Sequence, residues 1–482
     1  MKELLATGLD AARTAGATYA DVRIVERREN RVAVRDRSLS LMEETESLGY
    51  AARVLVNGAW GFASSTRLDR DEMAATARLA LDVARASAAV PKGRPAEMAP
   101  EPAHRDRLEG PCEEDPFAVP DSEKADVLLS ACASMLAVEH IAQAWASLQF
   151  IRQRRHIATT DGSSLDLTTW IANPALTAVA VVGAESQTRS YQGGARQAGY
   201  EFVRQVDLGG NAKRWAEEAV TKARADDSPQ GTMDLVLDPD NLALTMHESV
   251  GHPTESDRVL GWEANMAGRS FVRPADVGSL RYGSDLVNFT VDNGLAGGVG
   301  SWFYDDDGVP MQKFAMIRGG VLVNLGLTRE TAPILGLGRS NGCCRADGYA
   351  TFPINRIPNL YMEAGPTARA TPDDLIRGVE RGVYVEGMGS FSIDQMRRNF
   401  QFGGDCFSLI ENGRRTRPLK KVTYQAQTTD FWGSCDAIAG PAWWRPHGIM
   451  NCGKGEPGQV MCMTHGASFC RFRNVRVGGA RI

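Results

Sequence analysis

The stretch His247-Glu248-Ser249-Val250-Gly251-His252 contains two imidazoles, with a carboxylate next to the first. These are the side chains of a zinc hydrolase site, provided that the backbone directs both rings at one metal ion. In the common zinc-binding helix the two histidines are four residues apart and share one face. Here they are five residues apart, about 140° around an ideal helix, so a regular helix would point the rings in different directions. A π-bulge would restore the shared face, and we expect Gly251 to make that distortion less costly.

Catalytic zinc sites use three protein ligands and leave a fourth position open, so the two histidines need a distant partner. The candidates near the C-terminus are Cys452, Cys462, His465 and Cys470. Cys462 and His465 form a Cys-x-x-His pair with suitable local spacing. Cys452 lies in a glycine-flanked loop two residues before Lys454, and a nearby cation favours a thiolate. The residues by themselves leave the choice of third ligand open.

Each of these side chains also has an ordinary structural explanation. The two histidines could lie at a helix end and be satisfied by backbone carbonyls, and Glu248 could be a solvated carboxylate. Cys452, taken alone, is more often a small buried hydrophobe. In the functional interpretation, Glu248 is the general base that takes a proton from metal-activated water.

The composition limits the classes of protein to consider. With 482 residues and 43% hydrophobic content, the chain is long enough for two domains. Its 54 Lys+Arg and 59 Asp+Glu give a net charge of −5, which does not indicate binding to nucleic acid or to an anionic membrane. The sequence shows no secretory signal and no run of about 18 apolar residues, and the nine cysteines do not suggest a disulfide framework. We therefore expect a soluble cytoplasmic protein.

Hydrophobic periodicity and turn residues predict the elements of a first domain, residues 1–228. An Asn57-Gly58 pair predicts a hairpin within residues 53–63, and Asp161-Gly162 joins two long antiparallel strands. Seven prolines between Val90 and Pro120 predict a surface excursion without helix or strand. The other predicted elements are a helix to about residue 15, a strand over 21–34, and helices over 68–87, 121–136 and 211–225.

A polar run with proline and glycine, residues 226–231, predicts the boundary to a second domain, residues 229–482. There a strand over 233–237 precedes Asp238-Pro239, a cap and first residue typical of a helix start. This helix should carry His247 and end near His252, because Pro253 cannot continue it. Farther on, hairpins are predicted at 318–320 and 412–413. The predicted class is α+β: a mixed α/β layered N-terminal domain, then a C-terminal domain dominated by antiparallel β-sheet that carries a zinc-binding helix.

The segment from His247 to Glu255, continued by Gly261-Trp262-Glu263-Ala264-Asn265, resembles the metal-binding segment of the TldD/PmbA family. These are TldD-type zinc metalloproteases, also called modulators of DNA gyrase. The resemblance extends over nearly the whole chain. Its further motifs are Asp292-Asn293-Gly294, Asp305-Asp306-Asp307-Gly308, Arg329-Glu330-Thr331-Ala332, Phe402-Gly403-Gly404-Asp405 and Asn451-Cys452-Gly453-Lys454-Gly455.

The resemblance implies a metallopeptidase in which His247, His252 and Cys452 bind zinc and Glu248 is the catalytic base. It selects Cys452 over Cys462 as the third ligand. It implies short or unfolded peptides as substrates. The residues expected near substrate or beside the zinc ligands are His465, Glu255, Gly403 and Gly404.

The resemblance also implies a dimer, either of two identical chains or with a sister subunit that lacks the histidines. Because this chain has the histidines, it resembles the catalytic type of subunit. Two alternatives remain open: an amidohydrolase that tailors a peptide-like metabolite, and a catalytically idle binding or regulatory subunit.

Overall fold

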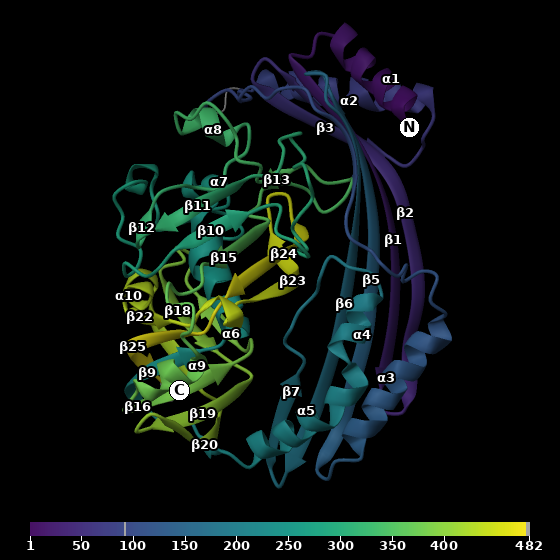
Figure 1. The fold of residues 1–482 in the computed structure, drawn as a ribbon. Helices are drawn as coiled ribbons and strands as arrows, with labels where there is room; N and C mark the ends of the chain where they lie inside the picture. The colour runs from purple at the N-terminus through teal and green to yellow at the C-terminus, as the bar shows by residue number, and fades with distance from the viewer. Residues whose placement is uncertain (91–92, 479–482) are drawn as a thin grey trace.

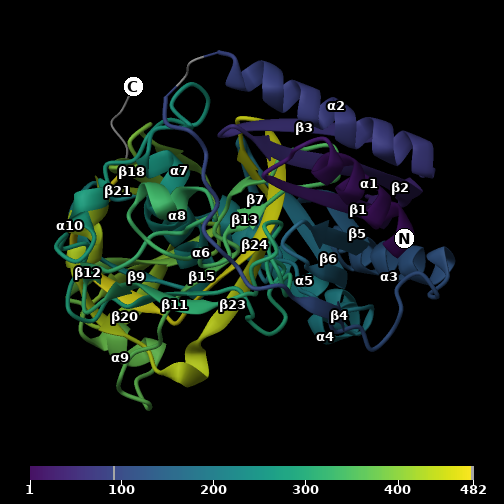
Figure 2. The same cartoon turned by 90° about the horizontal axis from the view of Figure 1, so that it is seen from above.

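The computed structural model describes residues 1–90 and 93–478, and these have an α+β fold. Long strands of one sheet stand beside a second region that contains two further large sheets and a two-stranded one (Figure 1). Seen from above, the first sheet and its helices lie on one side of the molecule and the second region on the other (Figure 2). Within the described residues, no helix is long and apolar enough to cross a membrane.

The first sheet has the strand order β3-β2-β1-β5-β6-β4, with β7 paired to β6. Its strands are β1 (Tyr19–Arg35), β2 (Ser38–Val56), β3 (Ala59–Ser65), β4 (Arg105–Glu109), β5 (Ile141–Thr159), β6 (Ser164–Val182) and β7 (Glu185–Ser190). The helices that accompany it are α1 (Lys2–Thr14), α2 (Arg70–Ala88), α3 (Asp121–Leu136), α4 (Glu201–Val206) and α5 (Leu208–Ala223).

The helices bury two separate portions of the long strands. Near one end of the strands, α1 and α2 pack on residues such as Val22 and Val54 (Figure 1). Near the other end, α3 and α5 cover a second cluster that includes Leu148 and Phe150. The predicted Asn57-Gly58 hairpin is confirmed, because Asn57 and Gly58 both have positive φ, 49° and 72°, as the tight turn between β2 and β3 requires.

The predicted excursion between Val90 and Pro120 is wrong at one place. Residues 91–92 lie outside the described part of the chain, but β4 follows within this segment and pairs in parallel with β6. All five residues of β4 are exposed. β4 lies at the sheet edge and buries neither face, so its sequence lacks the apolar alternation that would have predicted a strand. Residues Arg105–Glu109 also contain no proline, so nothing in them prevents strand pairing.

The second region contains two larger sheets. The six-stranded sheet has the order β12-β11-β10-β15-β24-β23, and the ten-stranded sheet has the order β17-β18-β21-β25-β9-β16-β19-β20-β8, with β22 paired to β25. Strands of the first of these are β10 (Phe289–Asp292), β11 (Lys313–Arg318), β12 (Val321–Leu322), β15 (Asn359–Met362), β23 (Arg445–Lys454) and β24 (Gln459–Ala467). Strands of the second are β8 (Asp226–Asp227), β9 (Gly231–Leu237), β16 (Arg381–Glu386), β17 (Phe391–Ile393), β18 (Asn399–Gly403), β19 (Cys406–Glu411), β20 (Arg414–Lys420), β21 (Thr423–Gln427), β22 (Cys435–Ile438) and β25 (Cys470–Val477).

Helices of the second region are short. They are α6 (Pro239–Met246), α7 (Ser256–Val259), α8 (Thr331–Ile334), α9 (Pro372–Arg377) and α10 (Thr428–Gly433), and a two-stranded ribbon is formed by β13 (Cys344–Arg345) and β14 (Ile354–Asn355). Helix α6 has a central position, because Leu242 and Met246 belong to one buried cluster with residues of both large sheets, such as Leu237 and Leu360. The helix that carries His247 is thus held from both sides.

Buried ion pairs join the first sheet to the second region. Arg53 of β2 donates to Asp307 at 2.7 Å, and Arg155 of β5 donates to Asp306 at 3.1 Å. The Asp305-Asp306-Asp307 motif, noted in the sequence, therefore helps to join the first sheet to the second region. Removing one partner of such a pair strongly destabilises the folded protein, because the other charge is left buried and unpaired.

Candidate metal centre

The first histidine is positioned by α6 and its distorted end. The Asp238 carboxylate caps α6 by accepting the Asn241 N–H at 2.8 Å, and Pro239 occupies the first helical position, as predicted. The last turn, His247–Gly251, is a π-helix in which the His252 N–H donates to the His247 carbonyl oxygen. The predicted distortion is confirmed, and it brings the two imidazole centroids to 4.6 Å.

The expected role of Gly251 in this distortion is wrong. Its φ of −57° and ψ of −65° lie in the right-handed helical region, which any L-residue adopts. A Cβ atom at this position would meet its nearest neighbours, Leu360 and the Met246 carbonyl, at 3.7 Å, an ordinary contact. The π turn therefore does not depend on the conformational freedom of glycine.

Cys452 comes to the histidines from β23, at the edge of the six-stranded sheet. Its Sγ lies 3.4 Å from Nε2 of His252, and the ligand atoms of His247, His252 and Cys452 all lie within 4.8 Å of one another. All three residues are buried. The other C-terminal cysteines lie elsewhere, since the Cys462 thiol contacts the Val299 carbonyl and the Cys470 thiol contacts the Ser468 carbonyl.

Each histidine has a partner behind it. Nδ1 of His252 lies 3.0 Å from Oε2 of Glu255, and Nδ1 of His247 lies 2.7 Å from Nε2 of His465. Lys454 lies 3.1 Å from Glu255 Oε2 and extends this network away from the centre. Such outer partners fix the orientation and tautomer of a metal-binding imidazole. Glu255 and His465, expected near substrate or beside the ligands, thus contact the two histidines directly.

The electrostatic surroundings favour the metal-binding forms of these side chains. Burial lowers the pKa of both His247 and His252 below the ordinary value, so both rings are neutral at pH 7. Burial by itself would raise the pKa of Cys452, but the pKa is lowered, chiefly by the nearby Arg356 guanidinium. The centre therefore offers two neutral imidazoles and a cysteine biased toward its thiolate.

These donors fit a zinc ion. Imidazole nitrogen and thiolate sulfur are its usual protein ligands, and three such ligands leave the open position of a catalytic site. Within the described residues, this is the one group of three or more His, Cys, Asp or Glu side chains whose ligand atoms converge in this way.

The three residues line a cavity of about 420 Å³. Its walls come from the edge strands of the two large sheets, β23 with Ile449 and Gly453, and β17 with Phe391. Glu248 also lines this cavity, and its Oε2 accepts a hydrogen bond of 2.5 Å from Nη1 of Arg397. Arg397 is 149 residues away in the sequence, and no spacing pattern could have linked it to Glu248.

Gly403 and Gly404 lie behind the wall of the cavity. The Gly403 carbonyl accepts from the Asn241 amide at 2.8 Å. The Gly404 backbone approaches Gly389, a lining residue, so closely that a Cβ atom on Gly389 would lie 2.4 Å from the Gly404 carbonyl oxygen. The glycines thus allow close packing that shapes the wall at residues 388–391.

Two family models match parts of the chain. Residues 230–470 match the model of the PmbA/TldA metallopeptidase C-terminal domain, and residues 20–84 match that of PmbA/TldA metallopeptidase domain 1. A relative from Methanothermobacter thermautotrophicus, named "Metalloprotease", is 28% identical over 96% of this chain and 95% of its own length. A "Zinc metalloprotease TldD homolog" from Saccharolobus solfataricus is 23% identical over 52% of each chain.

Two solved structures share the fold. A Thermotoga maritima protein superposes with a TM-score of 0.77 and 16% identity, over 99% of this chain and 100% of that one. TldE from Thermococcus kodakarensis superposes with a TM-score of 0.69 and 16% identity, again over 99% and 100% of the two chains. With the family model extending over half of the sequence, the chain belongs to the PmbA/TldD metallopeptidase family.

Proposed function

We propose that this chain is a zinc-dependent metallopeptidase that hydrolyses peptide bonds in short or unfolded peptides. The observation that carries the proposal is the convergence of His247, His252 and Cys452 beside Glu248 on one cavity. The names of the relatives, metalloprotease and zinc metalloprotease, support the same class of activity. When bound by these three residues, zinc supplies Lewis acidity that polarises a scissile carbonyl and activates water at neutral pH.

Glu248 is the residue to which we assign proton movement. Arg397 donates to its Oε2 and so holds the carboxylate in one orientation. Oε1 accepts no hydrogen bond from the described part of the chain, so it is the atom left to take a proton from the attacking water. The same oxygen can then pass that proton to the leaving amine nitrogen.

The walls of the cavity support an extended peptide as substrate. A volume of about 420 Å³ admits a few residues of a peptide but not a folded domain. β17 and β23 are the edge strands of their sheets, and an edge strand can bind an extended peptide through main-chain hydrogen bonds. Binding of this kind carries little sequence specificity.

We propose further that the enzyme works in the cytoplasm as a dimer, with a second copy or with a sister subunit that lacks the histidines. TldE, which shares this fold over the full length of the chain, is an example of a related chain that could serve as such a partner.

The decisive experiment compares zinc content and hydrolysis of an unstructured peptide for the wild type and Glu248→Gln. We expect the variant to retain zinc and to lose about 100-fold or more in kcat, because it keeps the shape but cannot accept the proton. Glu217→Gln, a change at an exposed glutamate of α5, serves as the matched control and should hydrolyse normally. Unchanged hydrolysis by Glu248→Gln would refute the role of Glu248, and purified protein that binds no zinc would refute the metal centre.

A further inference from the structure

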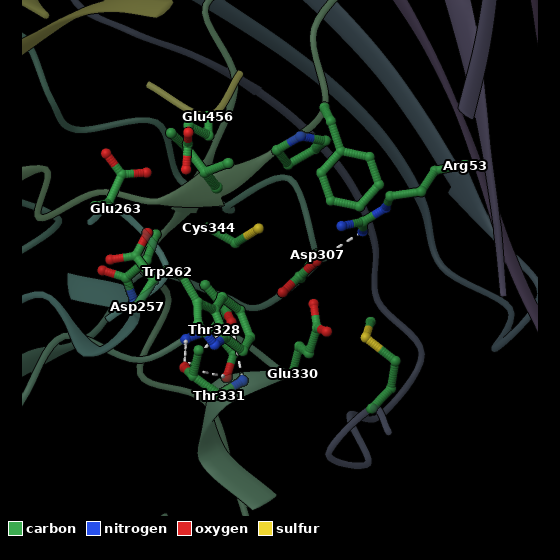
Figure 3. Close-up of a pocket in the computed structure, with 15 residues that line it drawn as sticks. Arg53, Asp257, Trp262, Glu263, Asp307, Thr328, Glu330, Thr331, Cys344 and Glu456 are labelled. Atoms are coloured by element: carbon green, nitrogen blue, oxygen red, sulfur yellow. Dashed lines mark hydrogen bonds and ion pairs between the residues drawn. The ribbon is translucent and has the colours of Figure 1, made fainter. Parts of the chain in front are cut away.

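A second cavity lies apart from the metal centre, where β2 of the first sheet approaches the segment after the metal-binding helix (Figure 3). Its volume is about 130 Å³, enough for a group of several heavy atoms, since one water occupies about 30 Å³ in the liquid. It shares no lining residue with the cavity at Cys452. The proposed peptidase mechanism does not use it.

Five of the 15 residues that line this second cavity are acidic. Two of them are neutralised within the protein, because Arg53 donates to Asp307 at 2.7 Å and Lys454 donates to Asp257 at 2.8 Å. Three others form no ion pair with any residue that the structure describes: Glu263, Glu330 and Glu456. The cavity therefore has more acidic side chains than cationic partners for them.

Two deeply buried side chains of the lining each have an oxygen atom that accepts no hydrogen bond from the described residues. Glu263 is 2% exposed, and its Oε2 has no hydrogen-bond partner. Asn355 is 1% exposed, and its amide donates to Ser256 and to the Gly326 carbonyl, which fixes its orientation and leaves Oδ1 without a partner. Buried polar atoms are nearly always matched, so unmatched acceptors call for a group that donates hydrogen bonds.

The arrangement suits an organic cation better than a metal ion. The carboxylates of this cavity do not point at one common position. Among the described residues, only His247, His252 and Cys452 bring three ligand atoms close enough together to share a metal ion. In Figure 3, Glu263 and Asp257 lie on one side of the cavity and Glu330 on the other. Dispersed acceptors fit a ligand whose N–H donors point in several directions.

The aromatic residues of the lining also favour binding of an organic cation. The Arg53 guanidinium already lies 5.4 Å from the centroid of Phe352, so this wall accepts a cation. Trp262 lines the opposite side and is 45% exposed, which places it where a ligand could enter from solvent. Burial also raises the pKa of Glu263 and of Glu330 to about 7, as expected for carboxyls that lack a cationic partner.

We propose that this cavity binds a small organic cation bearing a primary ammonium group, held by Glu263 and Asn355 beside Trp262. The α-ammonium group of a peptide and the ammonium group of an alkylamine share this chemistry. The site is separate from the metal centre, so the proposal stands whether or not the chain is a peptidase.

Titration calorimetry on the full-length chain tests the proposal with butylammonium chloride as the probe. Alanine amide replaces it to represent a peptide α-ammonium, and 1-butanol is the neutral control of the same length. We expect saturable binding of at least one of the two cations and none of butanol. Glu263→Gln should weaken binding about 10-fold or more, because a hydrogen bond to a charged group is lost. Glu139→Gln, at an exposed site, should bind like the wild type.

Trp262→Leu provides a second test on a half-exposed residue whose replacement should not affect folding. It should also weaken binding, because the aromatic wall is lost. Absence of saturable binding to the wild type would overturn the proposal, as would equal binding of butanol. Unchanged affinity in a folded Glu263→Gln variant would overturn it too, and if that variant does not fold, unchanged affinity in Trp262→Leu has the same meaning.

Discussion

Nδ1 of His247 lies 2.7 Å from Nε2 of His465, and Nδ1 of His465 lies 2.9 Å from the Leu360 carbonyl oxygen. Because a carbonyl only accepts, neutral His465 carries its proton on Nδ1, and its Nε2 accepts the proton on Nδ1 of His247. This leaves the Nε2 lone pair of His247 free for a metal ion. His465 is thus a positioning residue that selects the tautomer of a proposed ligand.

Replacing His465 should therefore weaken zinc binding. His465→Phe keeps most of the volume but offers no acceptor, and we expect the zinc dissociation constant to rise about 10- to 100-fold. His465→Gln, whose amide oxygen can accept, should lose less. Competition titration with a zinc chelator measures both, with His140→Asn at a surface turn as the control. Equal affinity in His465→Phe and the wild type would contradict the tautomer argument.

Gly251 should tolerate a side chain despite its place in the π turn. Gly251→Ala should raise the free energy of unfolding by about 0.5–1 kcal/mol, because alanine loses less backbone entropy in a helix. Urea denaturation measures this, and zinc binding should be unchanged. Gly448→Ala should instead lower the free energy of unfolding, because its Cβ would lie 2.0 Å from the Ala195 carbonyl oxygen and clash with it. Marked destabilisation by Gly251→Ala would show that the π turn needs glycine after all.

Asp405 should be one of the most sensitive positions for stability. Its carboxylate, 6% exposed, accepts hydrogen bonds from Arg189 at 2.8 Å and from Lys222 at 3.2 Å, joining the first sheet and α5 to the second region. Asp405→Ala should lower the free energy of unfolding by about 3 kcal/mol or more, because buried cations lose a partner. Asp226→Ala, which breaks an exposed pair with Arg417, is the control and should unfold like the wild type in urea. An equally small effect of Asp405→Ala would contradict the importance of these buried ion pairs for stability.

Glu330 should make stability depend on pH between about 4.5 and 7. Burial raises its pKa from 4.5 to about 7, and in that interval the folded state holds a proton that the unfolded state has released. The contribution of Glu330 therefore favours folding at low pH and is lost as pH rises toward 7. Glu330→Gln, which can still accept from Trp60, should be more stable than the wild type at pH 8, by on the order of 2 kcal/mol, but not at pH 4.5.

The measurement is the difference in unfolding free energy between variant and wild type across this pH range. Glu139→Gln, at an exposed site, should show a difference that does not change with pH. A pH-independent difference for Glu330→Gln as well would contradict the raised pKa.

Several features of this protein could be predicted from local sequence, because they depend on interactions within a few residues. Asp238-Pro239 starts a helix and Asn57-Gly58 makes a hairpin turn through the preferences of their own backbones. The five-residue spacing of His247 and His252 required a π turn, and the structure has one. The edge strand β4 was missed because its pairing with β6 comes from tertiary context rather than from its own residues.

The rest was decided by how the sheets assemble. Cys452 lies 200 residues from His252, and local spacing left the third ligand open until the family resemblance selected Cys452. The folded chain places Cys452 beside His252 and directs the Cys462 thiol to a backbone carbonyl. The contact of Arg397 with Glu248 and the unmatched acceptors of Glu263 and Asn355 likewise have no local signature. They arise from strand register and from burial, which set the partners and the charge of each side chain only once distant segments are packed together.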